Sequence, residues 1–225
     1  MYKYETHLHT YPVSACAKAN VRDTLEFYKE MGYDGVFITN HFLDGNINIS
    51  PAESYETKIN FYFSDYEDGV IIGNEIRLKV FLGVEMTYGG TDFLIYGLDK
   101  SWYLNNPQIM DMRQKEKLEY IMKNGGYIVQ AHPFREAAYI DHIRLYPRNV
   151  NAVEVINANR SDFENKMAKL YAENYNLPEV AGTDNHIGEK QSILAGVISD
   201  TPIKNEQDYI KMVENRKIKI FTCSR

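Results

Sequence analysis

Five of the six histidines occupy positions from which they could bind metal ions together. His7 and His9 flank Leu8 near the start of the chain, and side chains two residues apart in a strand point to the same side. The other candidate ligands are His41, Glu85, His132, Asp184 and His186. Neutral imidazole binds zinc and related metals, and carboxylates can bridge two ions. Such a set predicts a site for two or three divalent metals, which can activate water and clamp the oxygens of a phosphoryl transfer.

Short apolar or alternating runs precede these residues and predict the strands that position them. The predicted strands are residues 2–8, 35–39, 79–85, 92–97, 127–131, 152–156, 179–182, 194–198 and 218–222. Helices are predicted from Asn20 to Gly32 and over residues 50–74, 107–123, 136–145, 161–175 and 205–215. The alternation favours a parallel α/β architecture, and the number of strands in 225 residues favours a closed barrel over an open sheet.

All candidate ligands lie at or just after the carboxyl end of a predicted strand. In a β/α barrel these ends open onto the face where active sites lie, and in an open sheet they line a crevice. Each histidine taken alone is explained more simply as a packing residue. His142, in IDHIRLY, lies within a predicted helix and is assigned no role. The joint placement of the others is therefore what predicts a site.

In combination and order, the motifs around these residues resemble those of the PHP family, the polymerase and histidinol phosphatase superfamily. They are HLHT at residues 7–10, ITNH at 38–41, GVE at 83–85, AHP at 131–133 and GTDNH at 182–186. The resemblance runs from residue 5 to residue 187. It implies a distorted (β/α)7 TIM-like barrel, formed by residues 1–225 as a single domain. It also implies hydrolysis of phosphoesters with two or three divalent ions, often zinc, manganese or iron.

The resemblance also implies the ligands. The implied metal set is His7, His9, Cys16, His41, Glu85, His132, Asp184 and His186. Within it, Glu85 would bridge two ions, and Cys16 with two histidines would serve a third. Two positions depart from the family pattern: Asn40 stands where many members have aspartate, and Cys16 stands where an aspartate or histidine is usual. A thiolate binds zinc well, whereas the alternative for Cys16 is a small buried thiol. Glu154 is left out of the set because it fits an ion pair equally well.

Cationic side chains near the predicted site are candidates for binding a phosphate. Arg135 lies three residues after His132, and Arg160 follows the strand that ends at residue 156. Lys18 lies on the first loop. The alternative for each of the three is a solvated surface charge.

The predicted activity is metal-dependent hydrolysis of a small phosphomonoester, similar to that of a histidinol phosphatase. Asp184 would take a proton from water, His186 would protonate the leaving group, and Arg135 would stabilise the added charge. The alternatives are a 3′–5′ exonuclease acting on nucleic-acid ends and a non-catalytic module stabilised by metal. The net charge of −6 and the lack of an aromatic and basic stripe argue against nucleic acid.

The remaining features predict a cytoplasmic protein. Two cysteines, Cys16 and Cys223, do not make a disulfide framework. No apolar run reaches the length of a membrane span, and the N-terminus lacks the regions of a signal peptide. No membrane partner is expected, and no oligomeric state is predicted.

Overall fold

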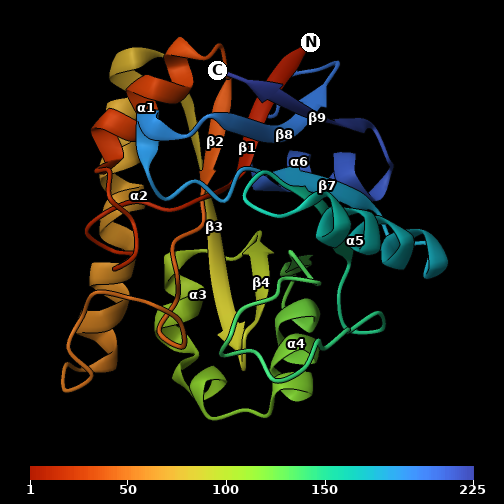
Figure 1. The fold of residues 1–225 in the computed structure, drawn as a ribbon. Helices are drawn as coiled ribbons and strands as arrows, with labels where there is room; N and C mark the ends of the chain where they lie inside the picture. Colours follow the sequence, from red (N-terminus) through yellow and green to blue (C-terminus); the bar gives the residue numbers. More distant parts are fainter.

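The computed structural model describes residues 1–225 and contains one strongly curved sheet of nine strands with helices packed around it (Figure 1). The strands are β1 (Tyr2–Leu8), β2 (Gly35–Ile38), β3 (Lys79–Tyr88), β4 (Thr91–Tyr96), β5 (Tyr127–Ala131), β6 (Ala152–Asn157), β7 (Glu179–Gly182), β8 (Ile193–Ser199) and β9 (Ile218–Ser224). The α-helices are α1 (Val21–Glu30), α2 (Tyr55–Ile76), α3 (Lys100–Asn105), α4 (Gln114–Lys123), α5 (Asp162–Asn174) and α6 (Glu206–Glu214). Two short 3-10 helices span Pro107–Met110 and Gly188–Lys190.

The strands follow the order β7-β6-β5-β4-β3-β2-β1-β8-β9 across the sheet. Neighbours pair in parallel from β1 to β3 and from β5 to β7. β4 is antiparallel to β3 and β5, and β8 is antiparallel to β1 and β9. A hairpin turn at Gly89 and Gly90 joins β3 to β4, and both glycines adopt positive φ angles that suit a tight turn. The sheet is therefore mixed, whereas strand and helix alternation alone favours a parallel one.

The sheet curves until its two sides meet at the carboxyl end of β1. There Leu8 forms a bridge with Asn185, just after β7, and Asn185 O accepts a hydrogen bond from His9 N at 3.0 Å. Asp184 N donates to His7 O at 2.9 Å. At its carboxyl end β1 is thus flanked by β2 on one side and by the segment after β7 on the other, whereas β8 pairs with its amino end. The prediction of an α/β fold with a barrel-shaped sheet is confirmed.

An aromatic cluster fills the sheet interior beneath the carboxyl ends of the strands. The ring centroid of Phe37 lies 4.8 Å from that of Phe81, 5.3 Å from that of Tyr96 and 4.6 Å from that of Tyr209 in α6. The Tyr96 hydroxyl donates to Thr6 O in β1 at 2.7 Å. These buried contacts fix β1, which carries the first two histidines, against β2, β3 and β4.

Capping side chains stand at the starts of α1 and α2. Asn20, at the predicted start of the first helix, caps α1, since its side chain accepts a hydrogen bond from Asp23 N. The second helix begins later than expected, because Ser54 rather than Ser50 accepts from the backbone, at Thr57 N. The predicted helix over 107–123 is divided into the 3-10 helix and α4, and α3 precedes it. No helix of the structure has both the length and the apolar character needed to cross a membrane.

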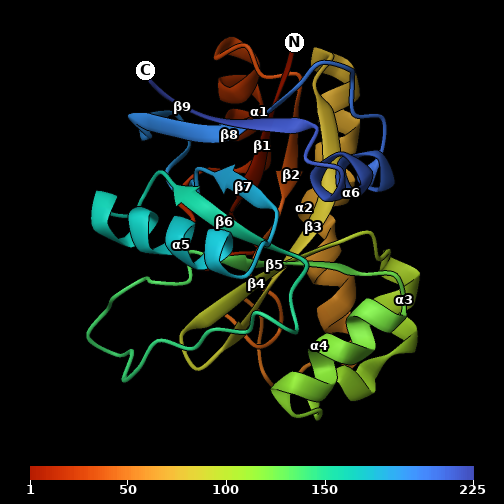
Figure 2. The same cartoon turned by 90° about the vertical axis from the view of Figure 1, so that its right-hand side faces the viewer.

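The helix predicted over residues 136–145 is wrong, because the segment between β5 and β6 is a long loop (Figure 2). Contacts with the turn between β3 and β4 explain its path. Arg144 Nη1 donates to Gly89 O at 2.6 Å, and Arg135 Nη2 donates to Gly90 O at 3.3 Å. Ile140 lies so close to Gly90 that a Cβ there would be 2.7 Å from its side chain. These tertiary contacts override local helix propensity.

Candidate metal centre

The histidines predicted as ligands converge at one end of the curved sheet. His7 lies in β1 and His9 directly follows it, with ring centroids 5.2 Å apart. His41 follows β2, and His132 follows β5. Glu85 lies within β3, which is longer than predicted, and it forms an isolated bridge with His41. Residues that are far apart in the sequence therefore share one site.

The carboxylate of Glu85 lies at the centre of this group and contacts four imidazoles. Its Oε1 atom is 3.1 Å from His7 Nε2 and 3.5 Å from His132 Nε2. Its Oε2 atom is 2.6 Å from His41 Nδ1 and 3.4 Å from His9 Nε2. The two oxygens thus face different pairs of histidines, so the carboxylate lies where it could contact more than one ion.

Asp184, which follows β7, contacts three of the histidines from the other side of the barrel. Its Oδ1 atom is 3.4 Å from His7 Nε2, 3.3 Å from His9 Nε2 and 3.4 Å from His186 Nδ1. Asp184 has a left-handed φ of 58°, a backbone conformation that aspartate tolerates better than most residues. The close approach of β7 to β1 requires glycine at position 182, since a Cβ there would lie 2.5 Å from the Cβ of His7.

Unpaired buried atoms show that the group fits metal ions. His7 Nε2, His9 Nε2, His41 Nδ1 and Glu85 Oε2 are buried and make no contact with hydrogen-bond geometry, although His41 Nδ1 lies only 2.6 Å from Glu85 Oε2. Leaving such atoms unpaired is unfavourable, and a bound cation would satisfy them. The residues form three overlapping triads whose ligand atoms lie within 4.8 Å of one another: His7, His9 and Asp184; His7, Glu85 and His132; and His9, His41 and His186.

Without metal, the electrostatics favour the ligand form for Glu85, Asp184 and His9. Despite their burial, the carboxylates that surround His7 and His41 raise the pKa of both imidazoles and favour their protonated forms. Burial raises the pKa of Glu85, but the charges of His41 and His7 outweigh it and hold that pKa well below its usual range. The pKa of Asp184 is lowered in the same way, mainly by His7. Burial and neighbouring histidine charges hold the pKa of His9 well below its usual value. Ionised carboxylates and a neutral imidazole are the ligand forms.

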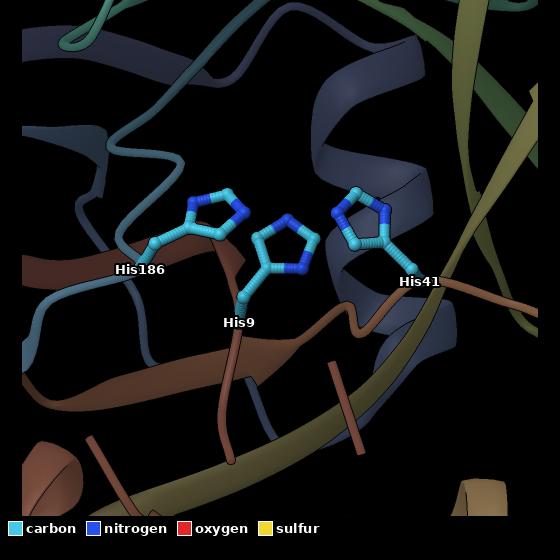
Figure 3. A group of neighbouring side chains, drawn as sticks. All are labelled: His9, His41 and His186. Atoms are coloured by element: carbon cyan, nitrogen blue, oxygen red, sulfur yellow. The ribbon is translucent and has the colours of Figure 1, made fainter. Parts of the chain in front are cut away.

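Cys16 lies beside the third triad. Figure 3 shows the His9 ring between those of His186 and His41, with centroid separations of 4.1 and 4.3 Å. The Cys16 thiol is partly buried next to this row. Burial raises its pKa, but hydrogen bonds to His186 and His41 outweigh that effect and lower the pKa to about 6. The thiol therefore lies where it could become a ligand of an ion bound by His41 and His186.

Cys16→Ser is expected to lower the occupancy of one metal site and to leave the ion between His7 and His9 in place. The reason is that a serine hydroxyl is a much weaker zinc ligand than a thiolate. Metal equivalents per chain, measured by elemental analysis, test this expectation. Cys223→Ser, at a partly buried cysteine in β9, is the matched control and should keep the full count. An unchanged count in Cys16→Ser would leave the third site to the histidines alone.

We call His7, His9, His41, Glu85, His132, Asp184 and His186 the metal group. Glu154, which has no role in the sequence prediction, contacts members of this group on the side away from the pocket. Its Oε1 atom lies 2.9 Å from His7 Nδ1, and its Oε2 atom accepts from His132 N at 3.0 Å and from Asn157 Nδ2 at 3.0 Å. Asn157 Nδ2 also lies 3.3 Å from Asp184 Oδ2. Glu154 therefore orients proposed ligands rather than pointing at the site as a ligand itself.

Asp92 is a further site residue that the sequence prediction missed. It is 2 % exposed in β4, and its Oδ2 atom lies 2.9 Å from Arg135 Nη2 and 3.8 Å from His132 Nε2. The sequence offers only an ambiguous signal, in that this aspartate interrupts the mostly apolar strand TDFLIY. Asp92 holds the Arg135 guanidinium beside the metal group.

The metal group forms the floor of an open pocket of about 590 Å³. Arg135 and Arg160 both line this pocket, as does Tyr139, whose ring lies 5.8 Å from the Arg135 guanidinium carbon. Arg160 Nε is buried without a hydrogen-bond partner. Lys18 lines a separate hollow beside α1, so the structure does not bring it to the same pocket. The backbone N–H of Lys18 nevertheless donates to His186 O at 2.7 Å.

No family model matches the sequence, and no curated protein matches it. Solved structures do match its fold. A two-domain protein from Bacteroides vulgatus, described as containing a predicted PHP-like metal-dependent phosphoesterase, aligns with a TM-score of 0.70 at 13 % identity. The alignment covers 98 % of this chain but only 64 % of that protein.

Two further structures share the fold. A candidate metal-dependent phosphoesterase from Bifidobacterium adolescentis has a TM-score of 0.56 and 12 % identity, with 96 % of both chains covered. The lesion-specific endonuclease EndoQ from Pyrococcus furiosus has a TM-score of 0.59 and 12 % identity, with 97 % of this chain and 57 % of the endonuclease covered. At these identities the likeness shows the fold, and it agrees with the PHP resemblance of the sequence motifs.

Proposed function

We propose that residues 1–225 form one metal-dependent phosphoesterase domain that hydrolyses the phosphomonoester of a small metabolite. The observation that carries this proposal is the convergence of Glu85, Asp184 and five histidines, with unpaired buried ligand atoms, on the floor of a pocket that also holds two arginines. A purely structural metal site is closed and uses four ligands. Fold neighbours described as metal-dependent phosphoesterases support a hydrolase.

The proposed cofactors are two or three divalent ions of zinc, manganese or iron. The proposed ligands are His7 and His9 with Glu85 and Asp184 for the first ion, Glu85 with His132 for the second, and His41 and His186 with Cys16 for the third. Bound there, such ions would polarise phosphate oxygens and supply an activated water.

The two arginines of the pocket are the proposed phosphate-binding residues. Arg135 is fixed by Asp92 and by the carbonyl of Gly90, so its guanidinium is already oriented when substrate arrives. The unpaired Nε of Arg160 leaves part of a planar donor fork available to phosphate oxygens. A contact with Lys18 stays a prediction, and it would require a substrate that extends past His186.

Asp184 and His186 are the residues proposed to move protons. Asp184 would take a proton from the attacking water, and His186 Nε2 would give one to the leaving oxygen as the P–O bond breaks. The His186 ring is held by its Nδ1 atom, 2.8 Å from Asp184 O, and its side chain is 25 % exposed. His186 cannot use Nε2 both to bind a third ion and to donate a proton, so occupancy of the third site selects its role.

The experiment that tests this function is a turnover screen with the metal-free protein reloaded separately with zinc, manganese or iron. We expect metal-dependent release of phosphate from one or more small phosphomonoesters and little cleavage of a labelled oligonucleotide. Preferential shortening of the oligonucleotide would favour nuclease activity, for which the endonuclease neighbour is the supporting observation. No turnover of any phosphoester with any metal would support the non-catalytic alternative. A Glu85→Gln sample prepared in parallel controls for contaminating phosphatases.

A further inference from the structure

A ring of buried hydrogen bonds lies behind His9, on the side away from Glu85 and Asp184. Ser14 Oγ lies 3.1 Å from His9 Nδ1, and it also lies 2.8 Å from the side-chain oxygen of Asn40. Asn40 Nδ2 donates to Asp65 Oδ2, in α2, at 3.2 Å. Thr10 completes the ring, because its hydroxyl accepts from Asn40 Nδ2 at 2.9 Å and donates to Asp65 Oδ2 at 2.7 Å. The proposed mechanism does not use Thr10, Ser14 or Asp65.

The orientation of the Asn40 amide is fixed by its partners. The backbone N–H of Thr10 points at Asn40 Oδ1 from 2.7 Å, and an N–H group can only donate. The other end of the amide faces the Asp65 carboxylate, which can only accept when ionised. The oxygen of Asn40 must therefore face Ser14, and its NH2 group must face α2.

This orientation decides where the Ser14 proton goes. Two oxygens 2.8 Å apart need a proton between them, and Asn40 Oδ1 has none, so Ser14 donates its single proton to Asn40. Ser14 Oγ already accepts from His41 N at 3.0 Å, and its remaining capacity is that of an acceptor. Its contact with His9 therefore requires the proton of the His9 ring to be on Nδ1.

A proton on Nδ1 leaves the lone pair of neutral His9 on Nε2. That atom is buried, has no hydrogen-bond partner and lies 3.3 Å from Asp184 Oδ1. We propose that Asp65 is a positioning residue that acts through Asn40 and Ser14 to hold His9 in the tautomer whose Nε2 atom binds the first ion. The proposal rests on the metal site of the proposed function.

The same arrangement accounts for the departure of the ITNH motif from its family pattern. His7 gives its Nδ1 proton directly to a carboxylate, that of Glu154. His9 instead reaches a carboxylate through a hydroxyl and an amide, because α2 brings Asp65 to the far side of Asn40. An aspartate at position 40 would bring two buried carboxylates to within about the 3.2 Å that now separates Asn40 Nδ2 from Asp65 Oδ2.

Nitrogen NMR of the metal-free protein, labelled with 15N-histidine, reads the His9 tautomer directly, with His9→Gln used to assign its signals. We expect a protonated Nδ1 and an unprotonated Nε2 in the wild type. In Ser14→Ala the second tautomer should become populated, and affinity for zinc at the first site should fall by about 10- to 100-fold. Ser14→Thr keeps a hydroxyl and should restore both readouts.

Two further variants separate positioning from general destabilisation. Tyr4→Phe removes a buried hydrogen bond from Ile203 N to the Tyr4 hydroxyl, far from His9, and should leave the tautomer and zinc affinity unchanged. Asn40→Asp should disturb the His9 signals, and adding Asp65→Asn should reverse most of that effect by restoring one carboxylate facing one amide.

An Nε2-protonated His9 in the wild type would overturn the proposal, as would a Ser14→Ala protein with unchanged tautomer and zinc affinity. The tautomer is measured without metal and without substrate. A wild type that shows the expected tautomer but binds no metal would therefore contradict the proposed function alone.

Discussion

Glu85→Gln is expected to lower kcat/KM by about 10³-fold or more while the fold survives. The carboxylate of Glu85 is within 3.5 Å of nitrogen atoms in four histidines, so its charge would act on two of the proposed ions at once. Glutamine keeps the shape of the side chain, and packing around the variant should change little. Its amide would nevertheless present N–H groups where an ion needs an acceptor. Loss of a residue that only orients a ligand costs less, about 10- to 100-fold.

Steady-state kinetics on the best phosphomonoester of the turnover screen measure this effect, together with metal analysis of the variant. Glu206→Gln is the matched control, because Glu206 accepts a hydrogen bond from Leu82 N in the same strand as Glu85 and lines a different pocket. The glutamine there can still accept that bond, so activity should be near that of the wild type. Near-normal turnover in Glu85→Gln would show that Glu85 is not a metal ligand.

The group of histidines could be predicted from the sequence because its signal is local. Each candidate follows a short apolar run, and parallel strands bring such positions together at one end of a sheet. The acids behind the site give no comparable signal. Glu154 and Asp92 each interrupt an apolar strand, a pattern that fits a ligand, an ion pair or an orienting carboxylate equally well. The partner of Glu154, His7, is 147 residues away, so only the closure of the barrel identifies it.

The fold could be predicted less completely than the site. Periodicity identifies a strand but carries no information about its direction, so the antiparallel pairing of β8 with β1 and β9 has no sequence signal. Residues 136–145 contain good helix formers, yet Ile140 and Arg144 are held by the turn at Gly89 and Gly90. That contact crosses about fifty residues of sequence, and local propensity cannot anticipate it.

Purification without chelator should yield at least two equivalents of transition metal per chain, and removing them should lower the temperature of unfolding. A ligand that binds only the folded state stabilises it by about 4 kcal/mol when its free concentration is 1,000-fold above its Kd. For a chain of this size, about 4 kcal/mol corresponds to roughly 8–16 °C for each site. Calorimetry of the metal-free protein, with and without added zinc or manganese, measures the shift.

Variants of two histidines make this measurement specific for the proposed site. His7→Asn removes a residue shared by two of the three triads and should abolish most of the shift. His142→Asn changes an exposed histidine on the loop after β5 and should keep the full shift, since His142 belongs to none of the triads. Equal shifts in both variants would mean that metal stabilises the chain elsewhere. The buried atoms of His7, His9 and Glu85 that lack hydrogen-bond partners predict a bound cation. A wild type with neither bound metal nor a shift in unfolding temperature would therefore refute the metal centre.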